Sequence, residues 1–180
     1  MKGYLFILLL SGTLLQHSCT NNMQNTTEET ITGYANDIGI PRDLQYFIKP
    51  EFQDSEISKG QPNVTIYDKL HRKLYIGTCY EEYPYFIDKF YEYKKELKDT
   101  NDLYFKSYET IAETMSKIDS DKDIILDSNK NYYVFYHYAM YAESMDRKKI
   151  PPMIKKYNDS VQFFFVNIDK VMKIEGVPKN

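Results

Sequence analysis

The stretch KLYIGTCYEEYPYFIDKF, Lys73–Phe90, is the part of the sequence on which the fold assignment rests. Its first five residues alternate and are rich in β-forming side chains, which predicts a strand over Lys73–Gly77. From Tyr83 to Lys98, aromatic and aliphatic residues recur at helical spacing, which predicts an amphipathic helix. Cys79 therefore lies at a predicted strand-to-helix junction.

The flanking segments extend this pattern in both directions. Asn63–Tyr67 alternates in the same way, and the charged residues before Lys73 suit a turn, so the two strands predict a β-hairpin. Thr110–Ile118 predicts a short helix, and the apolar run Asp123–Asp127 predicts a strand buried on both faces. Asn131–Ala142 combines helical length with aromatic and β-branched side chains; we expect a helix, with a strand as the alternative.

The remaining segments predict loops and a closing hairpin. Asp37–Pro62 is expected to be irregular with one short strand, and the lysine-rich Ser144–Ser160, broken by two prolines, to be a solvated loop. Val161–Val166 and Lys170–Gly176 flank a turn sequence and predict a C-terminal β-hairpin. Together these elements predict an α/β fold with a central mixed sheet flanked by helices.

The first residues have the features of an export signal. Residues 1–18 contain a basic start and an apolar core that is too short to span a bilayer, and they predict a cleaved signal peptide. A small residue, Ser18, directly precedes Cys19, which resembles the lipobox of bacterial lipoproteins. We expect Cys19 to carry lipids, palmitate among them, that anchor the chain to a membrane of the cell envelope, on its periplasmic or surface side. The alternative is an ordinary cleaved signal followed by an incidental cysteine.

Composition predicts one domain that follows a flexible tether. Residues 19–36 begin with a polar stretch and are expected to form a flexible tether, and residues 37–180 suit a single domain. The net charge of −3 lacks the basic footprint of a nucleic-acid-binding protein. The sequence contains no metal-binding His/Cys motif, no Gly-rich phosphate loop and no Gly-x-Ser-x-Gly elbow, so we expect neither a metal nor a cofactor.

Three stretches, in this order, resemble the redoxin-type lipoproteins of Gram-negative bacteria, which have a thioredoxin-like domain. The resemblance implies a thioredoxin-like fold for about residues 63–180, with Cys79 at the end of a central strand. The stretches are KLYIGTC (Lys73–Cys79), DKDIILDSNKNYY (Asp121–Tyr133) and VQFFFVNIDKVMKIEGVPKN (Val161–Asn180).

The site implied by this resemblance is degenerate. The family's Cys-x-x-Cys pair is replaced by Cys79-Tyr80-Glu81-Glu82, and the resolving cysteine that releases a mixed disulfide is missing. Cys79 is then either a monothiol catalytic residue, helped by a helix N-terminus but opposed by two nearby glutamates, or a buried small hydrophobe. We prefer the interpretation of Cys79 as a buried small hydrophobe, and whether the protein is an enzyme stays an open question.

Aromatic side chains near Cys79 offer a second kind of site. Tyr80, Tyr83 and Tyr85, with Glu82, would present flat apolar area with polar tips, which suits a peptide or an envelope protein. The expected function is therefore a membrane-anchored envelope lipoprotein whose redox-inactive, thioredoxin-like domain acts in binding or assembly. The alternatives are a monothiol thiol–disulfide oxidoreductase that uses Cys79, and a surface lipoprotein of another fold.

Overall fold

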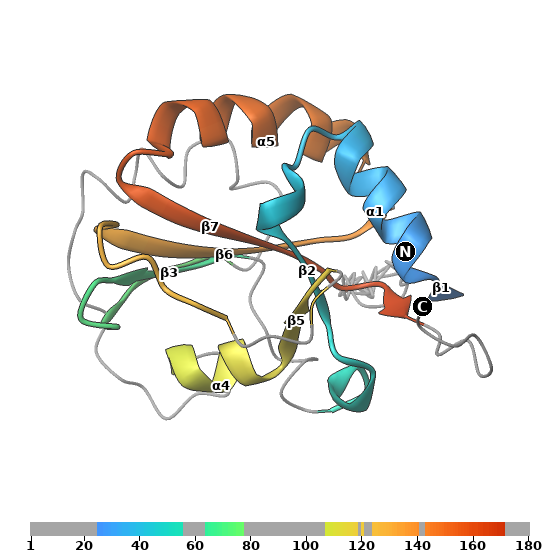
Figure 1. Cartoon of the computed structure of the whole chain (residues 1–180), viewed down its shortest axis with the longest axis horizontal. Coiled ribbons are helices and arrows are strands. Elements are labelled where there is room, and N and C mark those ends of the chain that lie inside the picture. The colour runs from blue at the N-terminus through green and yellow to red at the C-terminus, as the bar shows by residue number, and fades with distance from the viewer. Residues whose placement is uncertain are drawn as a thin grey trace, which may run out of the picture.

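A six-stranded mixed sheet forms the centre of the protein (Figure 1). The computed structural model describes residues 25–55, 64–77, 107–118, 120, 124–140 and 143–171. The strand order is β4-β3-β6-β7-β2-β5. The strands are β2 (Gln45–Ile48), β3 (Val64–Asp68), β4 (Lys73–Gly77), β5 (Met115–Lys117), β6 (Tyr132–Tyr138) and β7 (Val161–Asn167).

The middle of the sheet is parallel and its two sides are antiparallel. Strands β6, β7 and β2 run in the same direction, while β3 pairs antiparallel with β6, and β5 pairs antiparallel with β2. A second, two-stranded sheet pairs β1 (Asn25–Thr26) with β8 (Lys170–Val171) in parallel. Because β8 follows β7 closely, this small sheet lies at the carboxyl end of the parallel strands.

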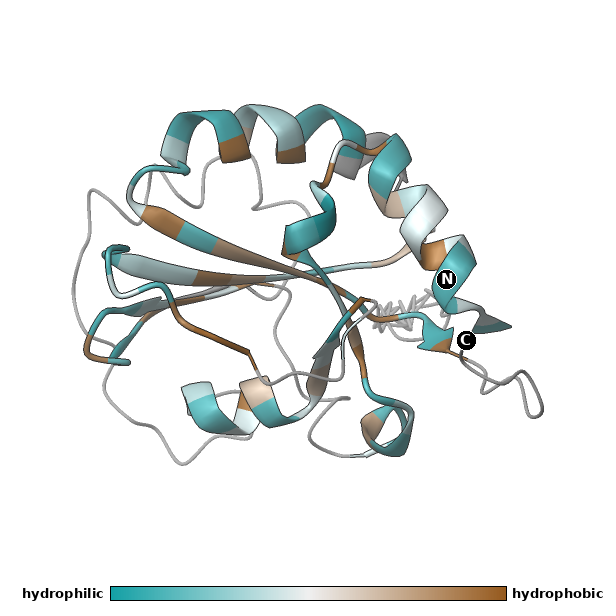
Figure 2. Ribbon diagram, viewed as in Figure 1, coloured by the Kyte–Doolittle hydropathy of each residue, from teal (hydrophilic) through white to brown (hydrophobic). Residues whose placement is uncertain are grey.

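Helices cover both faces of the sheet (Figure 1). Helices α1 (Glu28–Asp37) and α5 (Glu143–Tyr157) lie on one face, and α4 (Tyr108–Glu113) lies on the other. Short 3₁₀ turns, η1 (Arg42–Leu44) and η2 (Pro50–Phe52), flank β2. Figure 2 shows hydrophobic residues along the strands and on the side of α5 that faces them, as expected for a buried sheet.

Helix α1 has well-defined signals at both ends. The Thr27 hydroxyl accepts a hydrogen bond from the backbone N–H of Thr30, which caps the first turn. At the other end, the N–H of Gly39 bonds to the carbonyl of Asn36, and the N–H of Ile40 bonds to that of Ala35. This is a Schellman motif, and it places Gly39 at a φ of +81°, which favours glycine.

Helix α5 contains two prolines, Pro151 and Pro152, in its interior. Each proline removes a backbone donor, which normally breaks a helix. The ring of Pro151 lies directly over Gly39, where an added Cβ would come within 2.8 Å of the proline Cγ. Contact with α1 and the burial of Ile150 between the helices and the sheet stabilise α5 despite the prolines.

An aromatic row crosses the sheet on the α4 face. Phe135 and Phe164 stack with ring centroids 4.6 Å apart, and Tyr67 and Tyr46 extend the row onto β3 and β2. Tyr108 from α4 packs its ring 5.7 Å from that of Phe135. Burial raises the pKa of Tyr108 to about 12, with a smaller contribution from Glu109, so this phenol is neutral near pH 7.

Several sequence predictions are confirmed. The chain has a mixed α/β fold with a central mixed sheet. The hairpin of β3 and β4 forms, and β4 has the predicted bounds. One short strand, β2, forms in the described part of the segment after Asp37, residues 38–55. The predicted helix from Tyr83 to Lys98 lies outside the described residues.

Three predictions in the second half of the chain are wrong. The expected helix over Asn131–Ala142 is strand β6, because its side chains are buried on both faces and leave no helical periodicity. The expected loop over Ser144–Ser160 is largely helix α5. The helix expected over Thr110–Ile118 ends at Glu113, and Met115–Lys117 pairs with β2 instead.

The predicted C-terminal hairpin is also wrong. Its first strand, β7, pairs in parallel with β6 and β2, and the described part of its second strand, Lys170–Val171, pairs with β1. The predicted strand over Asp123–Asp127 is not formed by its described residues, 124–127, and the Ile125 side chain is exposed rather than buried.

The strand that precedes Cys79 occupies an unexpected place. Among the described strands, β4 pairs only with β3, in antiparallel fashion, so it lies at an edge of the sheet. Among the described residues, β4 therefore does not hold the central place that the redoxin resemblance implies. At the other end of the chain, residues 25–36 of the expected tether form β1 and most of α1, and Ile31 is fully buried, so folded structure begins by Asn25.

Candidate functional site: a pocket at the amino ends of the parallel strands

A pocket of about 660 Å³ lies where β2 and β7 begin. Its walls come from the turn before β2, the end of β5, the segment before β6, and the junction between α5 and β7. Apolar and charged side chains both contribute. The lining residues are Asp43, Leu44, Tyr46, Lys117, Ile118, Ser120, Ile124, Ile125, Asp127, Lys130, Asn158, Val161, Gln162 and Phe163.

The Gln162 side chain shapes one wall of the pocket. Its amide oxygen accepts a hydrogen bond of 2.8 Å from the backbone N–H of Asp127, and its amide nitrogen donates one of 2.9 Å to the carbonyl of Ile125. The side chain thus takes the part that a neighbouring strand would play for this backbone. The segment from Ile124 to Asp127 is held along β7 without joining the sheet ladder.

The same segment has an inner and an outer side. Ile124 and Leu126 pack against the aromatic cluster on the α4 face, while the Ile125 side chain between them is 77% exposed. Because Ile125 also lines the pocket, an apolar side chain stands at its rim with little to cover it. A single exposed isoleucine is ordinary on a protein surface. Here the Gln162 hydrogen bond and the packing of Ile124 and Leu126 hold the Ile125 side chain at the rim of the pocket, where it is available for a ligand contact.

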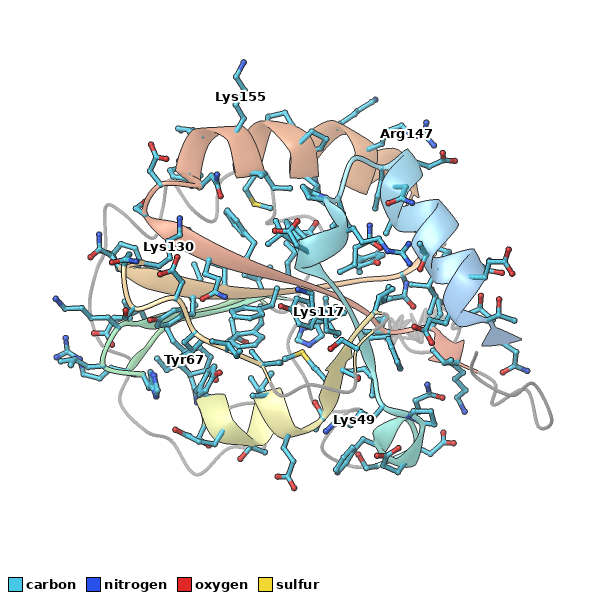
Figure 3. The ribbon with its side chains drawn as sticks, viewed as in Figure 1. Lys49, Tyr67, Lys117, Lys130, Arg147 and Lys155 are labelled. Atoms are coloured by element: carbon cyan, nitrogen blue, oxygen red, sulfur yellow. The ribbon has the colours of Figure 1, made fainter. Side chains whose placement is uncertain are left out.

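Two lysines and two aspartates give the pocket charges of both signs. Lys130 donates from its ammonium group to the carbonyl of Asn158, which ties the segment before β6 to the end of α5. The Asp127 carboxylate accepts from the backbone and side chain of Asn129. Lys117 lies at the end of β5, and Figure 3 labels both lysines. Asp43, another lining residue, is exposed.

Tyr46 contributes a neutral phenol to the lining of the pocket. Burial raises its pKa to about 12, and the negative charge of Asp43 acts in the same direction. The phenol is therefore protonated at neutral pH, and it can donate or accept a hydrogen bond but does not act as a base. Two of the polar side chains of the pocket, Gln162 and Lys130, hydrogen-bond to backbone groups of neighbouring segments.

The carboxyl ends of the parallel strands are closed. Asp169 and Asn167 are both 0% exposed. One Asp169 carboxylate oxygen accepts from the N–H of Met140 at 2.9 Å and from the Asn167 amide at 3.1 Å, while the Asn167 oxygen accepts from the Asp169 N–H. This network ties the end of β7 to the end of β6 and fills the place where ligands usually bind in open α/β sheets.

The residues singled out from the sequence do not form this pocket. Cys19, Cys79, Tyr80, Glu82, Tyr83 and Tyr85 all lie outside the described residues. Within the described part of the chain, no group of three or more His, Cys, Asp or Glu side chains is placed to hold a metal ion. None of the described helices is long and apolar enough to cross a bilayer.

Sequence reasoning missed the pocket residues Gln162, Lys117 and Lys130. One signal was present for Gln162, because it is the only polar residue within the apolar run of Val161–Val166. A polar side chain inside a strand that is buried on both faces requires a partner. No comparable signal marks the lysines, which resemble any solvated charge. Comparison of the chain with family models, with curated proteins and with solved structures finds no match.

Proposed function

We propose that the protein is a lipid-anchored protein of the cell envelope that acts by binding, with the pocket at the amino ends of β2 and β7 as its binding site. Its partner is an extended peptide segment of another envelope protein. The observation that carries the proposal is the Gln162 clamp, which presents Ile125 at the rim of a preformed pocket with charges of both signs. Preformed sites of this kind reduce the entropy cost of binding.

The lipid anchor rests on the sequence around Cys19. The short apolar core, the small residue before the cysteine and the polar residues after it support cleavage and lipidation at that point. Replacing Cys19 by Ala should release the protein from the membrane fraction and abolish incorporation of a palmitate analogue. Incorporation that persists in the Cys19→Ala variant would contradict the anchor.

A thioredoxin-like origin of the domain is part of the proposal. Helices on both faces of a mixed sheet and the parallel unit β6–α5–β7 support it. The edge position of β4 counts against it. Because the resolving cysteine is absent, dithiol chemistry is not proposed for the domain.

Photo-crosslinking in cells tests the pocket. A photoreactive residue in place of Ile125 should give a discrete crosslinked species, because its side chain stands at the pocket rim. The control position is Lys155, which points away from the sheet on the outer side of α5 (Figure 3). Crosslinks of equal yield at the two positions, or none at Ile125, would refute the pocket as the binding site.

A second candidate, a monothiol oxidoreductase, rests on Cys79 being the only cysteine left once Cys19 is lipidated. A reactive thiolate requires exposure and a lowered pKa. Alkylation of the folded protein near neutral pH should then be fast, with denatured protein as the reference. Labelling of Cys79 that requires denaturant would eliminate this candidate.

A further inference from the structure

We propose that the lipid anchor holds the carboxyl end of the parallel strands toward the bilayer, so that the pocket faces away from the membrane. This orientation rests on the proposed lipidation of Cys19. It follows from where the ordered chain begins and from the length of chain that separates it from the anchor. The surface beside the bilayer is the end of the molecule that contains β1 and β8, and its partner is the lipid headgroup layer.

The first step concerns the leash. Only five residues, 20–24, separate Cys19 from β1. The six Cα-to-Cα steps from Cys19 to Asn25 span at most roughly 21 Å even when fully extended. A leash of this length keeps Asn25 close to the headgroups.

The second step concerns how firmly that point is attached to the domain. Asn25 and Thr26 pair in parallel with Lys170 and Val171, and the Thr26 side chain is 4% exposed. The next residue, Thr27, caps α1. The point where the leash meets the domain is therefore part of the folded structure rather than a frayed end.

The third step places this point relative to the sheet. Strand β8 follows β7 after two residues, one of which is the buried Asp169 that ties the ends of β6 and β7 together. The leash therefore joins the domain at the carboxyl end of the parallel strands. Figure 1 shows β1 and the end of β7 on the same side of the molecule, with the start of β7 on the other.

The pocket lies at that other end. Its walls include Val161 and Phe163, at the start of β7. A seven-residue strand such as β7 is about 20 Å long from its first to its last residue. For the pocket to meet the bilayer first, the leash would have to run nearly the whole length of the sheet while fully stretched. That arrangement loses almost all the conformational freedom of the leash and is disfavoured.

Charge does not provide an alternative cause. At the end proposed to face the bilayer, the first turn of α1 has Glu28 and Glu29, and the one described lysine of β8, Lys170, is paired with Asp54. Acidic side chains are repelled by an anionic headgroup layer rather than attracted to it. The orientation is therefore set by leash length, and it should respond to a longer leash and not to salt.

Quenching from the membrane tests the orientation. The full-length lipidated protein, with Cys79→Ser to remove the native thiol, is placed in phosphatidylcholine vesicles that contain a headgroup spin-labelled lipid. A fluorophore is attached through Glu29→Cys at the β1 end or through Ser128→Cys beside the pocket; both positions are exposed. Quenching should be severalfold greater at position 29 than at position 128, and equal at low and high salt.

A leash variant provides the matched control. Inserting about 20 Gly and Ser residues after Thr20 gives a flexible leash with a root-mean-square length of roughly 25 Å, and the difference between the two positions should shrink strongly. Equal quenching with the native leash, or greater quenching at position 128, overturns the orientation. Intact mass separates the two failures: a lipidated chain with equal quenching refutes the orientation alone, and an unmodified chain refutes the anchor on which it rests.

Discussion

The two ends of the parallel strands β2, β6 and β7 use polar groups in opposite ways. At the carboxyl end, Asn167 and Asp169 are fully buried and bond to each other and to backbone. At the amino end, Gln162 and Lys130 hold backbone around an open volume of about 660 Å³. The chain closes the end that α/β proteins commonly use for ligands and leaves the other end hollow.

This contrast shows that the position of a site cannot be taken from topology alone. The carboxyl end is occupied because the chain turns directly from β7 into β8, which must pair with β1. Once that end is filled by the chain itself, the open volume lies at the amino end. The following predictions test whether the two ends differ in stability as they differ in structure.

The largest effect is expected at the closed end. Asp169→Ala leaves the Met140 N–H and the Asn167 amide without their acceptor, and should lower the free energy of unfolding by about 3 kcal/mol. Denaturant unfolding measures the change. Asp159→Ala, at an exposed position, is the control and should stay within about 0.5 kcal/mol of wild type. Similar values for the two variants would show that the closed end is not a stability element.

A smaller loss is expected in the helix layer that joins the two ends. Gly39→Ala places a side chain at a positive φ and against the ring of Pro151, and should cost about 2 kcal/mol. Gly33→Ala, within α1 and with nothing within 4 Å of the added Cβ, should instead stabilise by about 0.5–1 kcal/mol. Thermal unfolding of the pair checks the signs, and a Gly39→Ala variant as stable as wild type would contradict the close contact between Gly39 and Pro151.

A local effect is expected at the open end. Gln162→Leu removes both hydrogen bonds to the backbone of residues 125 and 127, at a cost of about 1–2 kcal/mol. Hydrogen exchange over residues 124–130 should quicken, while exchange in β6 stays slow. Gln162→Glu keeps an acceptor for the Asp127 N–H and should give an intermediate rate. Unchanged exchange in Gln162→Leu would mean that the clamp does not hold this segment.

The smallest effect concerns acid. Asp68 lies at the end of β3, beside the start of β6. Desolvation by burial raises the pKa of its carboxyl, but hydrogen bonds from Arg72 and Leu70, together with the charge of the Arg72 guanidinium, lower it further, so the net pKa lies below the ordinary value of 3.8. A depressed pKa contributes stability above the unfolded value that is lost as pH falls through the folded one. Melting temperatures of wild type and Asp68→Asn should therefore differ at neutral pH and converge well below pH 3.8; a constant difference would contradict the assignment.

What the sequence could predict depended on whether each element has a local signature. Apolar and polar side chains alternate along β3 and β4, and a charged turn joins the two strands, so both strands and their pairing could be predicted from the sequence. β6 has no signature because Tyr133 and Val134 are equally buried on opposite faces. α5 could not be predicted from its sequence, because its two prolines lower the helix propensity. A tertiary contact, between Pro151 and Gly39, overrides that propensity in the folded protein.

The site was less predictable than the fold for the same reason. Gln162 acts on backbone that is 35 and 37 residues earlier in the chain, and no window-based pattern links the two. α1 was hidden because its polar composition conceals two buried residues, Ile31 and Ala35, that lie one helical turn apart. The predicted residues around Cys79 lie outside the described part of the chain, so they stay a prediction.

The parallel pairing of β1 with β8 also governs the timing of folding. Asn25 leaves the ribosome long before Lys170, its partner in the small sheet. Contacts this distant in sequence form late and slow the overall rate. A chain made from its amino end cannot complete this sheet until nearly all of it has been synthesised, so the pairing of β1 with β8 is among the last steps of folding.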